Sequence, residues 1–353
     1  MEKDFNADMM LLARSLREKN QQDIADLTGK TQAYISKVEQ RILPPSNDFV
    51  QSLSEKLSFP VSFFYQPGDL AGVPTSVHTF FRKTEVDTLP KTPKAKTLSR
   101  LNAELSLRVT HLRIIKERLF DHQRNFNKLL DSTCPKSEQP ELAAKRFREY
   151  HNLGSGPIEN IASIVEGSGI LIFLCDFGEE TNEMVDGVSM NVPHLPPTIF
   201  LNKDRTADRM RFSLAHELFH VLAHRVPSDT MEKEANRFAA ELLMPAEEIQ
   251  KDLSDSISLN TLAALKPKWK ASIASLLYRA GELEIISSNQ SGNLWRQINQ
   301  RGWRKREPAS LDLDAEEISL VRDTFFSDPD VNLSELLHLH QHQIEEMYQM
   351  VTE

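Results

Sequence analysis

His216, Glu217 and His220 form the pattern His-Glu-x-x-His, whose residue types can hold a metal ion and activate water. Residues four apart on an α-helix lie one above the other, so both imidazoles can reach one ion. Glu217 lies about 100° further round such a helix, beside the vacant metal position, where it can take a proton from the attacking water. The flanking residues are largely apolar, so the helix should be buried, and a metal would compensate its polar side chains. The pattern predicts a Zn2+ site with Glu217 as general base; the alternative is an exposed helix with scattered His and Glu.

The third protein ligand of a catalytic zinc should come from another element. The next predicted helix, 231–243, offers three glutamates. We expect Glu234 to be the ligand, with Glu232 in solvent near the start of the helix. Glu241 falls on the same face as Glu234. It is expected either to support the ligands from outside the metal site or to compete with Glu234 as the third ligand. His224 repeats the four-residue spacing, and we expect it at the surface or behind the ligands.

The elements around these residues follow an order typical of the α+β class, namely helices, a small sheet and then helices. The apolar run Ile170–Leu174 predicts a buried strand, and the alternation from Val185 to Val192 predicts a second. The other elements expected are a strand at 197–202 and helices at 141–151, 159–166, 206–224, 231–243, 246–253, 258–265 and 269–282. The tail from about 310 is expected to be helical and acidic.

Residues 6–65 have the pattern of four short helices, and 21–41 that of a helix-turn-helix. Gly29 suits a helix end that needs positive φ, and Thr31 can cap the helix that follows. In such units the second helix of the pair enters the major groove of DNA. The candidate DNA contacts are Gln22, Gln32, Ala33, Tyr34, Ser36, Lys37 and Gln40. Many four-helix modules of this size bind no DNA, so the pattern alone leaves a structural module open.

The charge of the chain restricts any DNA binding to a local surface. The 353 residues carry a formal net charge of -9, and the first 70 hold 8 Lys and Arg against 10 Asp and Glu. Basic charge gathers instead at 78–128, with 12 Lys and Arg against 5 Asp and Glu, in a connector followed by a long helix predicted at 98–130. The two cysteines, Cys134 and Cys175, form no disulfide framework, and there is no apolar signal core or membrane-length apolar run. We expect a cytoplasmic protein without a membrane partner.

The runs 211–220 and 234–245, the strand 185–189 and the later runs 269–280 and 302–308 together resemble the ImmA/IrrE metallopeptidases. The resemblance covers roughly 145–310. It implies zinc ligands at His216, His220 and Glu234, Glu217 as general base, and a zincin-like, thermolysin-like arrangement with a small sheet beside the active helix. Members of that family cleave, or are thought to cleave, helix-turn-helix repressors.

The runs Gln22–Ala25, Ile35–Glu39 and Pro44–Ser46 resemble the Cro/C1-type (XRE) repressor domain over about 6–66. Arg41 departs from that pattern, which usually has a glycine there. The resemblances give four expected regions. These are a helix-turn-helix DNA-binding-type domain at 1–70, a basic connector and long helix at 71–137, an ImmA/IrrE-like metallopeptidase domain at 138–285 and a C-terminal helical region at 286–353.

These features predict a zinc-dependent regulatory endopeptidase with a DNA-binding domain, which cleaves a helix-turn-helix repressor or antitoxin to control transcription. The expected partners are that protein substrate, a DNA operator bound through residues 20–41, and a second copy of the chain. Two alternatives stay open. One is a DNA-binding regulator whose metallopeptidase-like domain serves as a sensor or dimerisation module, and the other is a component of a toxin–antitoxin or phage-defence system.

Overall fold

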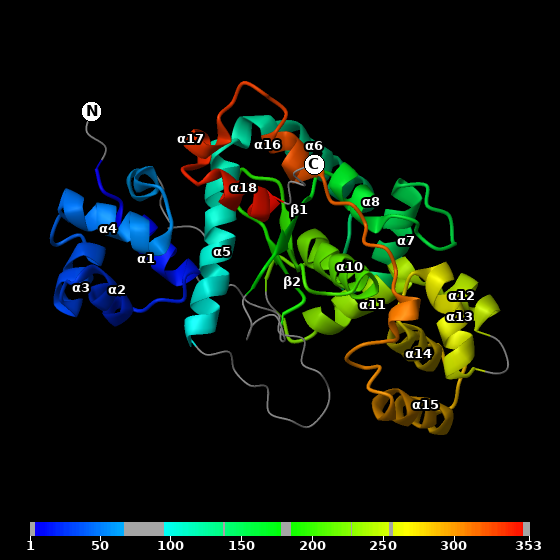
Figure 1. The fold of residues 1–353 in the computed structure, drawn as a ribbon. Helices are drawn as coiled ribbons and strands as arrows, with labels where there is room; N and C mark the ends of the chain where they lie inside the picture. The colour runs from blue at the N-terminus through cyan, green and yellow to red at the C-terminus, as the bar shows by residue number, and fades with distance from the viewer. Residues whose placement is uncertain are drawn as a thin grey trace.

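The computed structural model describes residues 4–66, 95–136, 138–177, 185–226, 228–253 and 257–348. Most of the predicted basic connector therefore lies outside the described residues. Figure 1 shows the N-terminal helices on one side, a small sheet in the middle and most of the remaining helices beyond it. Within the described residues, no helix is both long and apolar enough to cross a membrane.

The N-terminal helices begin and end close to the predicted residues. Gly29, with a φ of 65°, ends the second helix, and the Thr31 side chain accepts a hydrogen bond from the Tyr34 amide at the start of the third. Ile24 and Ile35 are fully buried between the helices. The elements are α1 (Ala7–Leu16), α2 (Gln21–Thr28), α3 (Gln32–Glu39), α4 (Asn47–Leu57) and the 3-10 helix η1 (Val61–Tyr65).

The long helix predicted over 98–130 is broken into two helices joined by a 3-10 turn. Leu112, Ile115 and Leu119 are all buried at helical spacing. The apolar pattern therefore runs through the break and does not reveal it. The first of the two helices packs on α1 and stands between the N-terminal helices and the sheet (Figure 1). The elements are α5 (Ala95–Ile114), η2 (Lys116–Leu119) and α6 (Phe120–Thr133).

The three predicted strands form one mixed sheet in the order β1-β3-β2. β1 pairs with β3 in parallel and β2 pairs with β3 antiparallel. Both faces of the sheet are buried: Phe173 enters the core shared with the N- and C-terminal helices, and its neighbour Ile172 enters the core on the other side. A strand buried on both faces reads as a continuous apolar run, as β1 does. The strands are β1 (Leu171–Cys175), β2 (Gly187–Met190) and β3 (Thr198–Asn202).

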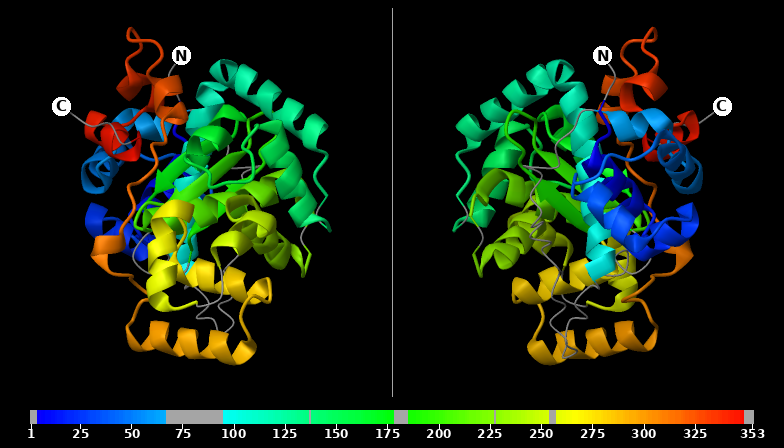
Figure 2. Two further views of the ribbon diagram at one scale, coloured as in Figure 1. Left: turned by 90° about the vertical axis from the view of Figure 1, so that its right-hand side faces the viewer. Right: turned by 90° about the vertical axis from the view of Figure 1, so that its left-hand side faces the viewer.

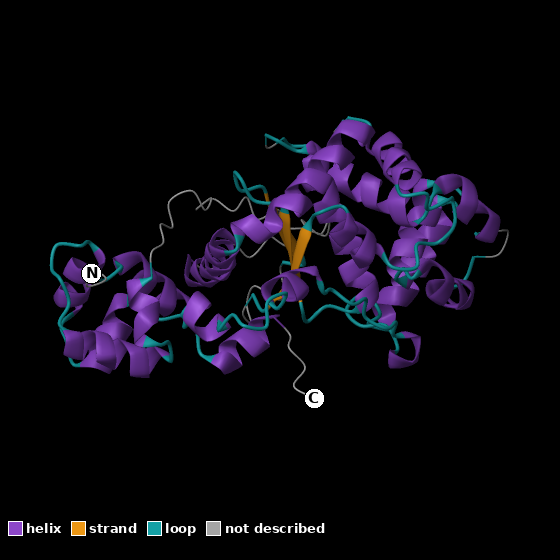
Figure 3. Ribbon diagram, turned by 90° about the horizontal axis from the view of Figure 1, so that it is seen from above, coloured by secondary structure: helices purple, strands orange, loops and turns teal. Residues whose placement is uncertain are grey.

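Helices lie on several sides of this sheet, as the view from above shows (Figure 3). The α+β class and the mostly helical character are as predicted. The helix predicted over 269–282 is shorter, because Trp269 ends the preceding helix, Lys270 takes a φ of 49°, and Ser272 caps the next helix. The elements are α7 (Pro140–Tyr150), α8 (Ile161–Gly167), α10 (Ala207–Ala223), α11 (Met231–Leu243), α12 (Ala246–Asp252), α13 (Leu259–Trp269), α14 (Ile273–Glu282) and α15 (Ser288–Gln300).

The C-terminal segment crosses back to the sheet and to the N-terminal helices (Figure 2). Its α16 and α18 contact β1, and its α17 contacts α5. The Gln343 side chain donates to the Ser58 carbonyl at 2.9 Å, and the Tyr348 hydroxyl lies 2.7 Å from Nδ1 of the buried His111. The last helices thus complete a core that the first helices begin. The elements are η3 (Ala309–Leu311), α16 (Leu320–Phe325), α17 (Leu333–Leu337) and α18 (Gln341–Tyr348).

Candidate metal centre

α10 carries three of the predicted site residues and is enclosed by α11 on one side and by β2 and β3 on the other. His216 is 9% exposed, Glu217 3% and His220 4%. Polar side chains that are buried to this degree require partners, because their desolvation is otherwise uncompensated. The helix is therefore buried as the sequence predicts, and its His216 and His220 side chains face α11.

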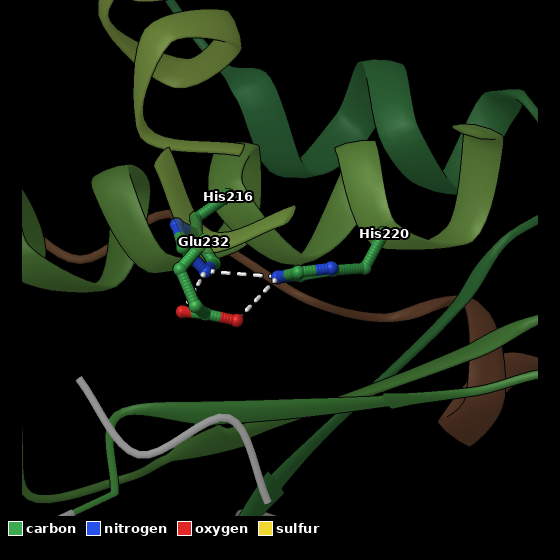
Figure 4. Close-up of side chains that lie close together, drawn as sticks. All are labelled: His216, His220 and Glu232. Carbon is green, nitrogen blue, oxygen red and sulfur yellow. Dashed lines mark hydrogen bonds and ion pairs between the residues drawn. The ribbon is translucent and has the colours of Figure 1, made fainter. Parts of the chain in front are cut away.

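The two imidazoles of α10 meet one carboxylate of α11, that of Glu232 (Figure 4). The Nε2 atoms of His216 and His220 are 3.1 Å apart. Glu232 Oε2 lies 3.4 Å from Nε2 of His216, and Glu232 Oε1 lies 3.3 Å from Nε2 of His220. A tetrahedral zinc ion with bonds of about 2.0–2.1 Å holds its ligand atoms about 3.3–3.4 Å apart. The donor types and their separations therefore fit a zinc ion.

In the structure Glu232, and not the predicted Glu234, lies with the two histidines of the ligand set that we predict from the sequence. Glu232 and Asn236 are four residues apart, so they share the face of α11 that is turned toward α10. Glu234 lies about 200° away from Glu232 around the helix and cannot share that face. Its Oε2 is instead 2.9 Å from Nε2 of His224. Burial opposes the ionisation of Glu232, but without a metal ion hydrogen bonds from the two imidazoles outweigh this and lower the pKa of Glu232 to about 2, so it stays a carboxylate.

Asn236 fixes the orientation of the first imidazole. Its Oδ1 lies 3.0 Å from Nδ1 of His216. Since an amide oxygen can only accept, the proton of His216 is on Nδ1, and Nε2 presents its lone pair to the site. The sequence prediction missed Asn236, although its spacing from Glu232 was available as a signal.

The rival carboxylate Glu241 lies elsewhere. It is 4% exposed and forms a buried ion pair with Arg279, which also bonds the Met244 carbonyl at 3.1 Å. Its role in the structure is to tie α11 to α14. Glu241 is therefore neither among the candidate ligands nor a hydrogen-bond partner of one of them.

Glu217 lies beside the ligands and against β2. Burial raises its pKa above the usual value, and a hydrogen bond with the Ser189 side chain opposes that rise. Its other carboxylate oxygen, Oε2, is buried and has no protein partner. An unsatisfied buried carboxylate oxygen next to a pocket is suited to accept a hydrogen bond from water. Ser189 is a further residue that the sequence prediction missed.

A small pocket opens at Glu217. Its volume of ≈ 20 Å³, taken over the positions that the centre of a water molecule can reach, is enough for one water molecule. Asp186 on its rim is held by Arg205 at 2.6 Å and Arg209 at 3.0 Å. These ion pairs fix the chain at the start of β2. The pocket is lined by Asp186, Gly187, Phe212, Ser213, His216, Glu217 and Glu232.

Gly187 lets β2 approach the general base closely. A Cβ at this position would lie 3.0 Å from Cγ of Glu217 and 3.2 Å from a methyl carbon of Leu201. We expect Gly187→Ala to displace the Glu217 side chain and to lower kcat/KM by about 100-fold, since misplacement of a catalytic group by about 1 Å has that order of effect. The metal content should stay unchanged, because the ligands lie on other residues.

Kinetics and metal analysis on the same preparations would check this expectation. Gly156→Ala is the matched control, since a Cβ there meets nothing within 4 Å. Wild-type kcat/KM in the Gly187→Ala enzyme would show that the close approach of β2 has no bearing on Glu217.

The candidate DNA contacts on α2 and α3 lie apart from the metal centre. Tyr34 packs edge-on against Phe49, with ring centroids 5.1 Å apart, and Gln22 donates to Asp26 at 2.7 Å. The exposed candidates are Gln22, Gln32, Ala33, Lys37 and Gln40, and the partly buried ones are Tyr34 and Ser36. The helices form as predicted, while their binding to DNA stays a prediction.

Residues 165–280 match the family model of the IrrE N-terminal-like domain. No similar curated protein was found for the chain. The matched range holds the whole sheet, α10, α11 and every residue of the metal centre. The resemblance of the N-terminal helices to the XRE domain lies outside it and stays a prediction. This part of the chain is thus similar to the metallopeptidase-like domain of the ImmA/IrrE type.

Proposed function

We propose that the chain is a zinc-dependent endopeptidase. The observation that carries the proposal is the triangle of His216, His220 and Glu232, whose donor atoms are 3.1 to 3.4 Å apart beside the buried Glu217. Three protein ligands with an adjacent carboxylate that does not join them are typical of a catalytic rather than a structural zinc site. The match to the IrrE N-terminal-like domain supports the same chemistry.

A zinc ion in this position would polarise the peptide carbonyl and lower the pKa of water. Glu217 would accept a proton from the attacking water through its unpaired Oε2 and then pass it to the leaving amine. Burial raises the pKa of Glu217 above its usual value, which makes it a stronger proton acceptor. Ser189 would hold the carboxylate in place during both transfers.

The substrate would bind as an extended strand along β2. This strand is at one end of the sheet order and packs against α10, which carries His216 and His220, whereas β1, at the other end, is contacted by α8, α16 and α18. An extended peptide can add to an open sheet edge through main-chain hydrogen bonds. Such a peptide along β2 would run past the pocket at Glu217. We assign the substrate to a helix-turn-helix repressor or an antitoxin.

The N-terminal helices would direct this activity. The exposed polar side chains of α3 support contact with an operator, and the basic segment at 78–128 could supply phosphate contacts. The N-terminal helices and the domain that holds the candidate metal centre share one hydrophobic core, which runs through α5 and one face of the sheet. This continuity also supports a second candidate, in which the peptidase-like domain is the sensor of a DNA-binding regulator.

Metal analysis and proteolysis of the full chain separate these candidates. We expect about one zinc per chain and cleavage of a repressor encoded in a neighbouring reading frame. Glu217→Gln should keep the metal and lower the cleavage rate by about 100- to 10,000-fold, the range of a general base. Failure of the intact chain to bind added zinc, or undiminished cleavage by Glu217→Gln, would contradict the proposal.

A further inference from the structure

Two hydrogen bonds form a chain behind His220, on the side away from the metal centre. Nδ1 of His220 lies 2.8 Å from Nδ1 of His224, and Nε2 of His224 lies 2.9 Å from Oε2 of Glu234. The His224 side chain is 4% exposed and that of Glu234 is 14% exposed. These two side chains are therefore largely shielded from water, so their hydrogen bonds meet little competition from solvent.

The end of α10 creates this arrangement. The helix ends at Ala223, and His224 takes an extended backbone with φ of -92° and ψ of 105°, while its amide still bonds the His220 carbonyl. The His224 ring therefore does not continue the row that the His216 and His220 rings form on the helix. It lies on the Nδ1 side of His220. The edge-on contact with Phe219, at 5.0 Å between centroids, holds the ring there.

Glu234, the acceptor at the end of these two hydrogen bonds, sets the direction of both. The carboxylate of Glu234 can only accept, so His224 donates from Nε2. Neutral His224 then has a bare Nδ1, which accepts from the Nδ1 hydrogen of His220. The lone pair of His220 is left on Nε2, the atom that faces His216 and Glu232. Asn236 imposes the same tautomer on His216 from the other side of the site.

We propose that His224 and Glu234 are positioning residues that hold His220 in the tautomer and orientation required for metal binding. The inference rests on the proposed zinc site. Outer partners of metal-bound histidines fix the ring and increase its basicity, and their loss costs about 10- to 100-fold in metal affinity. Here that partner is a second imidazole, oriented in turn by a carboxylate.

Two substitutions of His224 separate hydrogen bonding from packing. His224→Phe keeps an aromatic ring against Phe219 but removes the acceptor. His224→Asn loses the ring but keeps an acceptor, because Oδ1 of Asn can take the place of Nδ1. We expect His224→Phe to weaken zinc binding by about 10- to 100-fold and His224→Asn to retain more of the affinity. Competition with a chromogenic chelator would measure both.

His151→Phe is the matched control, since it removes a half-buried imidazole that bonds Ser168 and no residue of the site. It should leave zinc affinity unchanged. Tighter binding by His224→Phe than by His224→Asn would show that His224 only packs, and would overturn the proposal.

A second measurement needs no metal. In the zinc-free wild-type protein, 15N NMR of the histidine rings should show the His220 proton on Nδ1, and His224→Phe should shift it partly to Nε2. A wild-type His220 whose Nδ1 carries no proton would overturn the inference even if zinc binds. Conversely, a wild type that binds no zinc but has the proton on Nδ1 would overturn the proposed function and leave the hydrogen-bond chain established.

Discussion

Glu232→Gln is expected to weaken zinc binding by more than about 100-fold, because a ligand contributes more to affinity than the outer partners, whose loss costs about 10- to 100-fold. Gln keeps the length of the side chain but replaces the carboxylate by a neutral amide, which is a poorer zinc ligand. The carboxylate of Glu232 is the only one that the described residues bring to both His216 and His220. Isothermal titration of the metal-free chain with zinc would give the affinity.

Glu234→Gln is the decisive comparison, since the same substitution is made two residues further along α11. Its amide oxygen can still accept from His224, so the loss of affinity should be much smaller than for Glu232→Gln. Glu247→Gln, on a side chain that is 85% exposed, should have no effect. If Glu234→Gln instead loses the metal and Glu232→Gln keeps it, Glu234 is the ligand and the sequence prediction holds against the structure.

Gly169→Ala is expected to lower the free energy of unfolding by about 2–5 kcal/mol. Gly169 has a φ of 82°, which costs other residues about 1–2 kcal/mol. An added Cβ would also lie 2.8 Å from the carbonyl carbon of His122 and nearer still to its oxygen. Because the neighbour is backbone of α6 and not a flexible side chain, the collision can be relieved only by moving a helix, which costs about 1–3 kcal/mol more.

Urea unfolding of the full chain would measure this effect. Gly167→Ala is the control, since that glycine is exposed at the end of α8 and a Cβ there meets nothing within 4 Å. It should be neutral or stabilise by up to about 1 kcal/mol, because alanine restricts the unfolded chain. Equal effects of the two substitutions would show that the packing of α6 over Gly169 does not contribute to stability.

Much of the fold can be predicted from the sequence because its patterns are local. The three strands follow from apolar runs, and Gly29 and Thr31 mark the ends of neighbouring helices by their own backbone and side-chain preferences. The breaks at 115–119 and 270–272 are different. Apolar spacing continues across the break at 115–119. The break at 270–272 depends on a left-handed backbone conformation at Lys270, which a lysine in the sequence does not predict.

The candidate site divides in the same way. His216, Glu217 and His220 are fixed by spacing within one helix, so the sequence is sufficient to find them. The third ligand depends on which face of α11 is turned toward α10, and that rotation is set by tertiary packing. Glu232 with Asn236 and Glu234 with Glu241 are both plausible pairs on a single helix. Only the contact between the helices distinguishes them.

The position of the C-terminal helices has a consequence for synthesis on the ribosome. α16 and α18 cover β1, and Gln343 bonds Ser58 of the N-terminal helices. One side of the sheet therefore cannot be sealed until residues 320–348 have emerged, although the metal-centre residues emerge about a hundred residues earlier. We infer that the nascent chain passes through a stage with an open apolar face, in which chaperones would have a target. A protein arranged in this way completes its native fold only once translation has passed α18.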